Sequence, residues 1–180
     1  QSNYFKNQQI SISKDVSGNQ NFNTKVIPLV FHIIHDGHPI GEDENVSVEQ
    51  IENAVSILNE DFNTLNPDLE NVVSQFQNII GDANIAFRLA KLDPDGNCTS
   101  GINRVFSDMT NQANDCIKDL IAWDDSKYVN IWVVEDIDSS IGAAAYTYLP
   151  GTLWGDEVEG IIINHEYLGS IGSSNNTPYK

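Results

Sequence analysis

Runs of apolar residues divide the middle of this chain into segments typical of strands and helices. Lys25–His35 (KVIPLVFHIIH) is a β-branched apolar run that stops at Asp36-Gly37, which predicts a buried strand. Pro28 indicates that the start of this strand lies at a sheet edge or carries a bulge, because proline cannot donate to a ladder. Later apolar runs predict further strands at 84–91, 102–106, 128–136, 143–149 and 160–164.

One helix has a clear start in the sequence. Ser47-Val48-Glu49-Gln50 is a capping box, and the apolar residues after it recur at helical spacing, so we expect a helix that ends near Asn66-Pro67. The pattern indicates a second helix over 68–80 and a third over 112–122. Asp93-Pro94-Asp95-Gly96 has the composition of a turn.

The order of these segments predicts an α/β (α+β) fold. A strand that is joined through a helix to a parallel neighbour needs a right-handed crossover. Two such units, from 25–35 to 84–91 and from 102–106 to 128–136, predict a mixed sheet with two or three helices on one face. Residues 1–24 are rich in Asn, Gln and Ser and predict a linker or a loosely held segment, whereas 170–180 predict a loop.

Length and charge narrow the classes of function. The chain has 180 residues, which is one domain with or without a tail, and its formal net charge is −17. This charge argues against nucleic acid and anionic membrane surfaces as partners, because both would repel it. No apolar run reaches the roughly 18 residues that cross a bilayer. The charge suits a secreted protein or one that faces cationic ligands or calcium, although simple solubility is the plainer explanation.

The chain contains two cysteines, Cys98 and Cys116. An even pair in a turn-rich segment predicts one disulfide, which would imply an oxidising compartment. Two free thiols are the alternative. A zinc site built from this pair alone is not expected, because such a site needs three or four ligands.

Two groups of side chains resemble metal sites but depart from the required spacing. His32 and His35 should point to opposite faces of a strand, and His38 lies beyond the following turn, so the three do not converge without a bulge. The Asp93–Asn97 segment begins like a calcium loop, but its glycine is in the fourth position and the twelfth position holds Arg104. A plain turn is therefore favoured there, and calcium binding has no support in the pattern.

His165-Glu166 begins like a zinc motif and does not continue as one. H-E-x-x-H places two imidazoles on one face of a helix, whereas Gly169 stands where the second histidine is needed. Phosphate loops, the nucleophile elbow and the local signatures of catalytic cysteines are also missing. The sequence therefore contains no complete catalytic apparatus.

One segment is a candidate for recognition, namely Ala143, Ala144, Ala145, Tyr146 and Thr147. Small side chains let another backbone approach closely, and an edge strand of this kind can bind an extended peptide by adding it to the sheet. An ordinary interior strand beneath a helix fits the same residues, and the two interpretations stay open on these grounds.

The ordered set of segments resembles the pappalysin family of metzincin zinc peptidases. The similarity covers residues 25–170 without large gaps, and its strongest piece is the Tyr-x-Asn-Ile-Trp-Val-Val strand. The segments that carry it are VIPLVFHIIH (26–35), SVEQIENAVSILNEDFN (47–63), ANIAFRLAKLDPDGNCTSGINRV (83–105), WDDSKYVNIWVV (123–134), AYTYLPG (145–151) and EGIIINHEYLG (159–169).

This resemblance implies a fold and a role for the region. In that family, the part matching 25–169 is the upper, N-terminal subdomain of the catalytic domain, a twisted mixed sheet with an antiparallel edge strand. The strand matching 143–149 forms the upper rim of the cleft, so the resemblance makes 143–147 the expected substrate-binding residues. The family then continues into H-E-x-x-H-x-x-G-x-x-H, which binds zinc. That motif is absent here, and 170–180 resemble the loop leading to it.

Two functions are compatible with these observations. The first is the N-terminal half of a secreted zinc-dependent endopeptidase that acts on proteins or peptides. Its zinc ligands and lower cleft wall would come from a C-terminal subdomain missing from this chain, so the chain alone should hydrolyse nothing. The second is a stand-alone, non-enzymatic module that captures peptides on the same edge strand. An in-frame zinc motif beyond codon 180 would separate the two.

Overall fold

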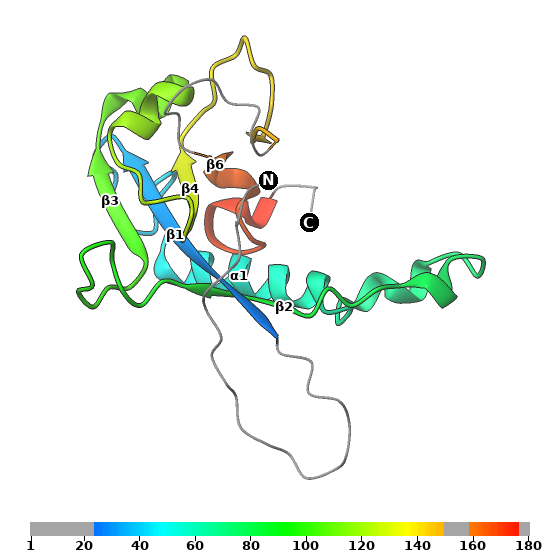
Figure 1. The fold of residues 1–180 in the computed structure, drawn as a ribbon. Coiled ribbons are helices and arrows are strands. Elements are labelled where there is room, and N and C mark those ends of the chain that lie inside the picture. Colours follow the sequence, from blue (N-terminus) through cyan, green and yellow to red (C-terminus); the bar gives the residue numbers. More distant parts are fainter. Residues whose placement is uncertain (1–23, 150–158, 177–180) are drawn as a thin grey trace.

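A computed structural model describes residues 24–149 and 159–176, and the structural statements below concern these residues (Figure 1). The strands are β1 (Lys25–His35), β2 (Ile85–Leu89), β3 (Ile102–Phe106), β4 (Val129–Val134), β5 (Ala145–Tyr146) and β6 (Gly160–Asn164). The α-helix is α1 (Val48–Phe62). Short 3-10 helices are η1 (Pro67–Asn71), η2 (Gln77–Ile79), η3 (Asp108–Gln112), η4 (Asp115–Asp119), η5 (His165–Tyr167) and η6 (Gly172–Asn176).

The strands form one mixed, six-stranded sheet in the order β2-β1-β4-β6-β5, with β3 paired to β1 as well. Along one edge of β1, β2 pairs with the first half and β3 with the second half, whereas β4 pairs with the opposite edge. All of these pairs and β4–β6 are parallel, and β5 is antiparallel to β6. The predicted mixed sheet with an antiparallel edge strand is therefore confirmed.

β1 is the centre of the sheet because it is apolar on both faces. Leu29, Phe31 and Ile33 enter the core on the α1 side, and Ile34 enters the core on the other side. Parallel strands covered on both faces have such continuous apolar runs. Pro28 lies where β1 pairs with β2 only, since pairing with β4 begins at Leu29. Its missing N–H therefore falls on a locally free edge, as the sequence predicted.

The helix α1 starts as its capping box predicts. Ser47 is the N-cap, and its hydroxyl accepts a hydrogen bond from the backbone N–H of Gln50 at 3.1 Å. The helix packs Ile51 and Ala54 onto the sheet. It ends at Phe62, before the expected Asn66-Pro67, because Asn63 leaves the helix and its side-chain amide donates to the carbonyl of Ile85 on β2.

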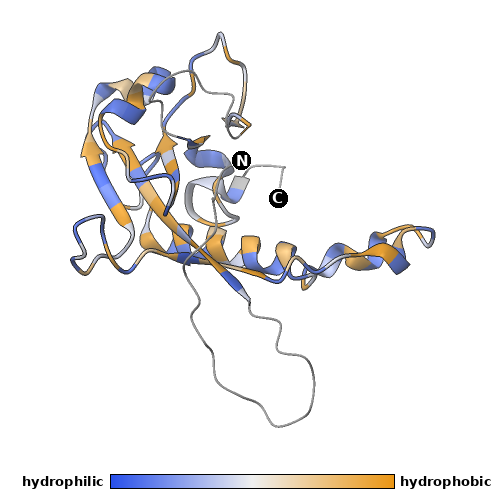
Figure 2. Cartoon of the chain, viewed as in Figure 1, coloured by the Kyte–Doolittle hydropathy of each residue, from blue (hydrophilic) through white to orange (hydrophobic). Residues whose placement is uncertain are grey.

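The two further helices predicted from periodicity are wrong as α-helices. Over 68–80 the chain forms only η1 and η2, separated by an extended Val72, in an arm that projects from the body (Figure 1). Figure 2 shows the hydrophobic segments of this arm in orange. The apolar residues that suggested a buried stripe are instead largely exposed. They are Val73, Phe76, Ile79 and Ile80. Without a surface to cover them, their spacing does not sustain a helix.

Over 112–122 a contact with the segment after β4 interrupts the expected helix. The N–H of Ala113 donates to the carbonyl of Asp136 at 2.9 Å, which separates η3 from η4. Asn114 then caps η4 through its side chain, which accepts from the N–H of Cys116. Ala113 and Ile117 pack with Trp132 and other buried residues on the face of the sheet opposite α1. The sheet thus has a layer on each face rather than helices on one.

The predicted disulfide does not form, and Cys98 and Cys116 are free, exposed thiols. Cys98 precedes β3 and Cys116 follows it, so the two lie in segments at opposite ends of a five-residue strand. Such a strand spans about 13 Å or more. A disulfide requires α-carbons within about 7 Å.

Two predicted terminal segments lie mostly outside the described residues. Residues 1–23 of the expected N-terminal linker fall there, as do 177–180 of the expected loop. Within that expected loop, 172–176 form the 3-10 helix η6. Over 24–149 and 159–176, no helix has both the length and the apolar character that crossing a membrane demands.

Candidate functional site: the edge strand and the surface beside it

The strand β5 lies at the edge of the sheet, which confirms the edge interpretation of this segment and excludes the interior one. Ala145 pairs with Ile163 and Tyr146 with Ile162, so the regular strand is shorter than the predicted 143–149. The carbonyl of Ala144 accepts from the N–H of Asn164 at 2.9 Å. Because backbone groups alternate in direction along a strand, the N–H and C=O of Ala145 point to the free edge.

The side chains of β5 divide between two faces. Ala145 shares a face with its partner Ile163, on the α1 side of the sheet, and it is exposed. Tyr146 shares the opposite face with Ile162 and packs against the core there. Burial raises the pKa of the Tyr146 phenol, and its hydroxyl is buried without a hydrogen-bond partner. The strand therefore has a large anchor on one face and small side chains on the other.

A second tyrosine and a buried lysine hold the same segment against η4. The hydroxyl of Tyr148 donates to Oδ2 of Asp115 at 2.8 Å. Lys118, which is 7% exposed, places Nζ 2.7 Å from Oδ1 of Asp115. The same ammonium lies 5.3 Å from the ring centroid of Tyr148 and 5.8 Å from that of Trp132. These contacts fix the segment after β5 without using its free edge.

The sheet surface next to β5 is apolar and only partly covered on the α1 side. Ile161 and Ile163 of β6 and Val129 of β4 are half-buried there, whereas Ile162, on the opposite face, is fully buried. The helix α1 lies against β2, and its Ile51 is completely buried in the same core as Leu29 and Phe31 of β1. An apolar strip along β4 and β6 therefore remains beside the edge strand.

The chain after β6 is directed onto the start of α1. Gln50 is 1% exposed, and its side-chain amide donates to the carbonyls of His165 and Leu168 at 3.2 and 3.1 Å. Asn53 accepts from the N–H of Ser170 at 2.7 Å. Gly172 has a φ of +65°, and a Cβ there would lie 2.2 Å from Oε1 of Gln50. Only glycine allows this close approach.

His32 and His35 make separate contacts within the fold. Nε2 of His32 lies 2.9 Å from Oδ1 of Asn130, and Nδ1 lies 3.2 Å from the amide of Asn103. Burial lowers the pKa of His32 to about 4, so the ring is a neutral core group at pH 7. His35 packs edge-on against the ring of Phe106. Both are structural.

The two acidic turns are also structural. The side chain of Asp93 accepts from the N–H groups of Asp95 and Asn97, which lowers the pKa of its carboxyl. These hydrogen bonds confirm the predicted turn. Asp124 likewise accepts from the N–H of Ser126 just before β4.

His165 and Glu166 lie in η5 rather than in a zinc helix. His165 is 5% exposed, and burial lowers its pKa, whereas Glu166 is exposed. The chain has four histidines and no H-E-x-x-H-x-x-G-x-x-H, so its residues do not fit the three-histidine zinc site of a metzincin. Among the described residues, one group of three or more side chains can share a metal ion, namely Asp36, His38 and Glu44.

Sequence reasoning missed this group because it treated His38 only with the other histidines. The available signal was the position of polar residues after the ends of neighbouring parallel strands, where side chains converge. The return of Glu44 to Asp36 could not be predicted in this way, because no sequence pattern indicates how the loop between them folds.

The comparisons with known proteins place the fold among the metzincins. No protein-family model and no curated protein match the chain. Solved structures do match: a promirolysin mutant of Tannerella forsythia and mirolysin in complex with compound 9 are each 31% identical over 86% of this chain, with TM-scores of 0.73. Mature mirolysin of T. forsythia in complex with a cleaved peptide is 32% identical over 86%, with a TM-score of 0.72.

This chain spans 50% of the promirolysin chain and 57% of each mirolysin chain, which is about half their length. The match therefore concerns part of those proteins. The described residues have a metzincin-type, metallopeptidase-like fold, with the mixed sheet and antiparallel edge strand that the sequence predicted.

Proposed function

We propose that this chain is the N-terminal half of the catalytic domain of a secreted, zinc-dependent endopeptidase of the pappalysin type. Its role is to supply the upper rim of the substrate cleft. The observation that carries the proposal is the exposed edge of β5, which is anchored from one face only, in a chain similar to a mirolysin bound to a cleaved peptide.

The rim would bind substrate through its backbone. A peptide in extended conformation can pair with the N–H and C=O of Ala145, and residues 143–147 would provide the length of the contact. Because Ala143, Ala144 and Ala145 are small, side chains of the peptide can lie close to the sheet on the α1 side. Tyr146 and Tyr148 face η4 and would leave that approach clear.

The metal would be held outside these 180 residues. A zinc ion in such a site polarises the scissile carbonyl and activates a water molecule. The apolar strip on β4 and β6, and the docking of η5 and η6 onto α1, support a following segment that packs beside α1. Such a segment would bring its ligands beneath the rim.

The direct test is the coding sequence that contains this chain. The proposal expects H-E-x-x-H-x-x-G-x-x-H in frame within about 30 codons after Lys180, because the family's motif follows its loop at that spacing. A stop codon there would instead favour the stand-alone peptide-binding module. Zinc analysis of the complete gene product and of the 180-residue chain, measured side by side, provides an independent check, because the complete product should hold one more zinc.

A further inference from the structure

Three neighbouring parallel strands end at one place on the molecule. Asp36 directly follows β1, Glu135 follows β4 and His165 follows β6, and these strands are adjacent in the sheet. The loop between β1 and α1 folds back over this end and adds His38 and Glu44. The edge strand β5 and the proposed peptidase role use none of these side chains.

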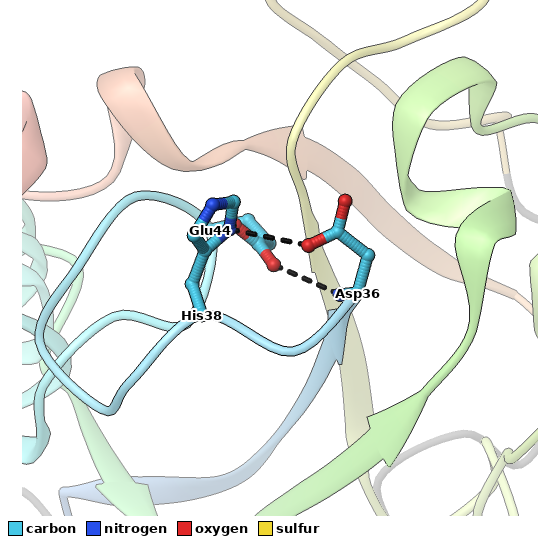
Figure 3. A group of neighbouring side chains, drawn as sticks. All are labelled: Asp36, His38 and Glu44. Atoms are coloured by element: carbon cyan, nitrogen blue, oxygen red, sulfur yellow. Dashed lines mark hydrogen bonds and ion pairs between the residues drawn. The ribbon is translucent and has the colours of Figure 1, made fainter.

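Asp36, His38 and Glu44 converge in this loop (Figure 3). Nδ1 of His38 lies 2.9 Å from Oε2 of Glu44 and 3.2 Å from Oδ1 of Asp36. The other oxygen of Glu44 accepts from the backbone N–H of Asp36 at 2.9 Å, which fixes the orientation of the carboxylate. One imidazole nitrogen therefore faces two carboxylate oxygens, although its single N–H can donate a well-aligned hydrogen bond to only one of them.

These distances match the spacing of neighbouring ligands around a small divalent cation. The ligand atoms of the three residues all lie within 4.8 Å of one another. Two ligands at right angles on a metal with bonds of about 2.1 Å lie about 3.0 Å apart. A cation in place of the shared proton would contact all three side chains with little movement.

Two buried polar atoms beside the cluster, one on His165 and one on Glu135, form no hydrogen bond of standard geometry. His165 is 5% exposed, its Nδ1 has no hydrogen-bond partner, and the charges of Asp43 and Glu44 act on its ring. Its Nε2 lies 3.2 Å from Oε2 of Glu135, a buried oxygen that also lacks a hydrogen bond. Buried polar atoms without partners are rare in folded proteins and often mark the place of a missing ion or water.

Acidic side chains outnumber histidines at this end of the sheet, where Asp36, Asp43, Glu44 and Glu135 lie near His38 and His165. The side chain of Glu44 is fully buried. Burial raises the pKa of Glu135, and the nearby charges of Glu44 and Asp43 raise it further. His38 balances part of this charge, since its contact with Glu44 raises the pKa of its imidazole, whereas burial lowers the pKa of His165. A bound cation would supply the missing positive charge.

The loop that carries the cluster is held in place by other contacts. Asn45 donates to the carbonyl of His38 at 2.6 Å, and the guanidinium of Arg104 donates to Asn45 and, at 2.8 Å, to the carbonyl of Val46. The N–H of Gly41 donates to the carbonyl of Asn45 at 2.7 Å. The three side chains are thus positioned before any ligand arrives.

We propose that Asp36, His38 and Glu44 bind a first-row divalent transition cation such as Zn²⁺ or Mn²⁺, with Glu135 and His165 beside them. One imidazole and two carboxylates suit these metals, whereas Ca²⁺ prefers six to eight oxygen ligands. Asp43, whose Oδ2 lies 3.7 Å from Nε2 of His38, would orient the ring from its other side. The bound ion would tie the β1–α1 loop to the ends of β1 and β4.

The test is metal titration of the 180-residue chain with Zn²⁺, Mn²⁺ and Ca²⁺ by calorimetry, together with the visible spectrum of bound Co²⁺. The variants are His38→Gln and Asp36→Asn, which replace partly exposed side chains and keep the buried Glu44. Asp61→Asn is the matched control, because it removes one exposed charge of α1. Circular dichroism verifies that each variant is folded.

The proposal expects one Zn²⁺ or Mn²⁺ per chain, weaker binding of Ca²⁺, and a Co²⁺ spectrum that indicates a nitrogen ligand. His38→Gln and Asp36→Asn should each weaken the binding at least about tenfold, since loss of an outer partner alone costs 10–100-fold. Asp61→Asn should bind as the original chain does. Absence of binding, equal affinity in His38→Gln, or tighter binding of Ca²⁺ than of Zn²⁺ would each overturn the proposal.

Discussion

His32 shows how a single buried side chain links the fold to pH. As a neutral ring it donates from Nε2 to Asn130 and accepts at Nδ1 from the amide of Asn103. Protonation would place a second N–H against the Asn103 donor, and burial adds a desolvation cost. The pKa of about 4 is therefore well below the ordinary value of 6.5.

This lowered pKa predicts a loss of stability in mild acid. The unfolded chain binds the proton below pH 6.5, and the folded chain binds it only near pH 4. The free energy of unfolding should thus fall between these values, by up to about 3 kcal/mol from this group. Urea unfolding at several pH values tests it, with His32→Gln, which does not titrate, as reference. Parallel pH profiles for the two proteins would contradict this role.

Gly172 gives a second prediction for a single residue. Gly172→Ala combines a φ of +65° with a Cβ that would lie 2.2 Å from Oε1 of Gln50. Gly142→Ala is the matched control, because Gly142 has a φ of +64° and nothing within 4 Å of the added carbon. In both variants the positive φ should lower the free energy of unfolding by about 1 kcal/mol through backbone strain.

Only Gly172→Ala also displaces the Gln50 side chain and its hydrogen bonds, so we expect it to lower the free energy of unfolding by about 1–3 kcal/mol more than the control. Denaturant unfolding of the two variants measures the difference. Equal losses would mean that η6 is not held tightly against α1.

Among the elements, strands were easier to predict than helices. β1, β3 and β6 have the predicted bounds. Short apolar, β-branched runs that are bounded by turn residues are typical of strands, so the sequence marks both ends of these elements. The predicted helices failed where neighbouring segments decide the structure. The N–H of Ala113 joins the end of β4, and the apolar residues of the 68–80 arm have no surface to cover them.

The candidate site, too, was predicted only in part. The small residues of 143–147 left an edge strand and an interior strand open, and the family resemblance alone favoured the edge. The anchoring of this segment by Tyr148, Asp115 and Lys118 could not be anticipated, because these residues are far apart in sequence and meet only through the fold. The cluster at Asp36 was missed for another reason: Asp36 and Glu44 are only eight positions apart, but it is the fold of the loop that returns Glu44 to the end of β1.

The edge strand predicts a specific effect of proline. Ala145→Pro removes the N–H that points to the free edge and leaves the pairing of Tyr146 with β6 in place. In the complete, zinc-containing protein, loss of one backbone hydrogen bond to substrate should lower kcat/KM about fivefold. Ala145→Gly, which keeps the N–H, should change it much less. If both variants lose activity equally, the backbone of β5 does not bind the substrate.

At the scale of the whole molecule, the described chain is a sheet with a packed layer on each face and one apolar strip left partly covered. The chain accounts for about half the length of the mirolysin structures it matches. The half-buried strip that the described residues leave beside β5, together with the missing three-histidine motif, supports the proposal that a second segment supplies the zinc ligands.

The central claim is that this half supplies a rim and that catalysis requires the other half. Peptide hydrolysis tests it most directly, measured in parallel for the complete gene product and for the 180-residue chain, each with and without a zinc chelator. The account predicts that the complete protein cleaves peptides until the chelator is added, and that the 180-residue chain cleaves nothing. Chelator-sensitive cleavage by the 180-residue chain alone, or an inactive complete protein that holds its zinc, would contradict it.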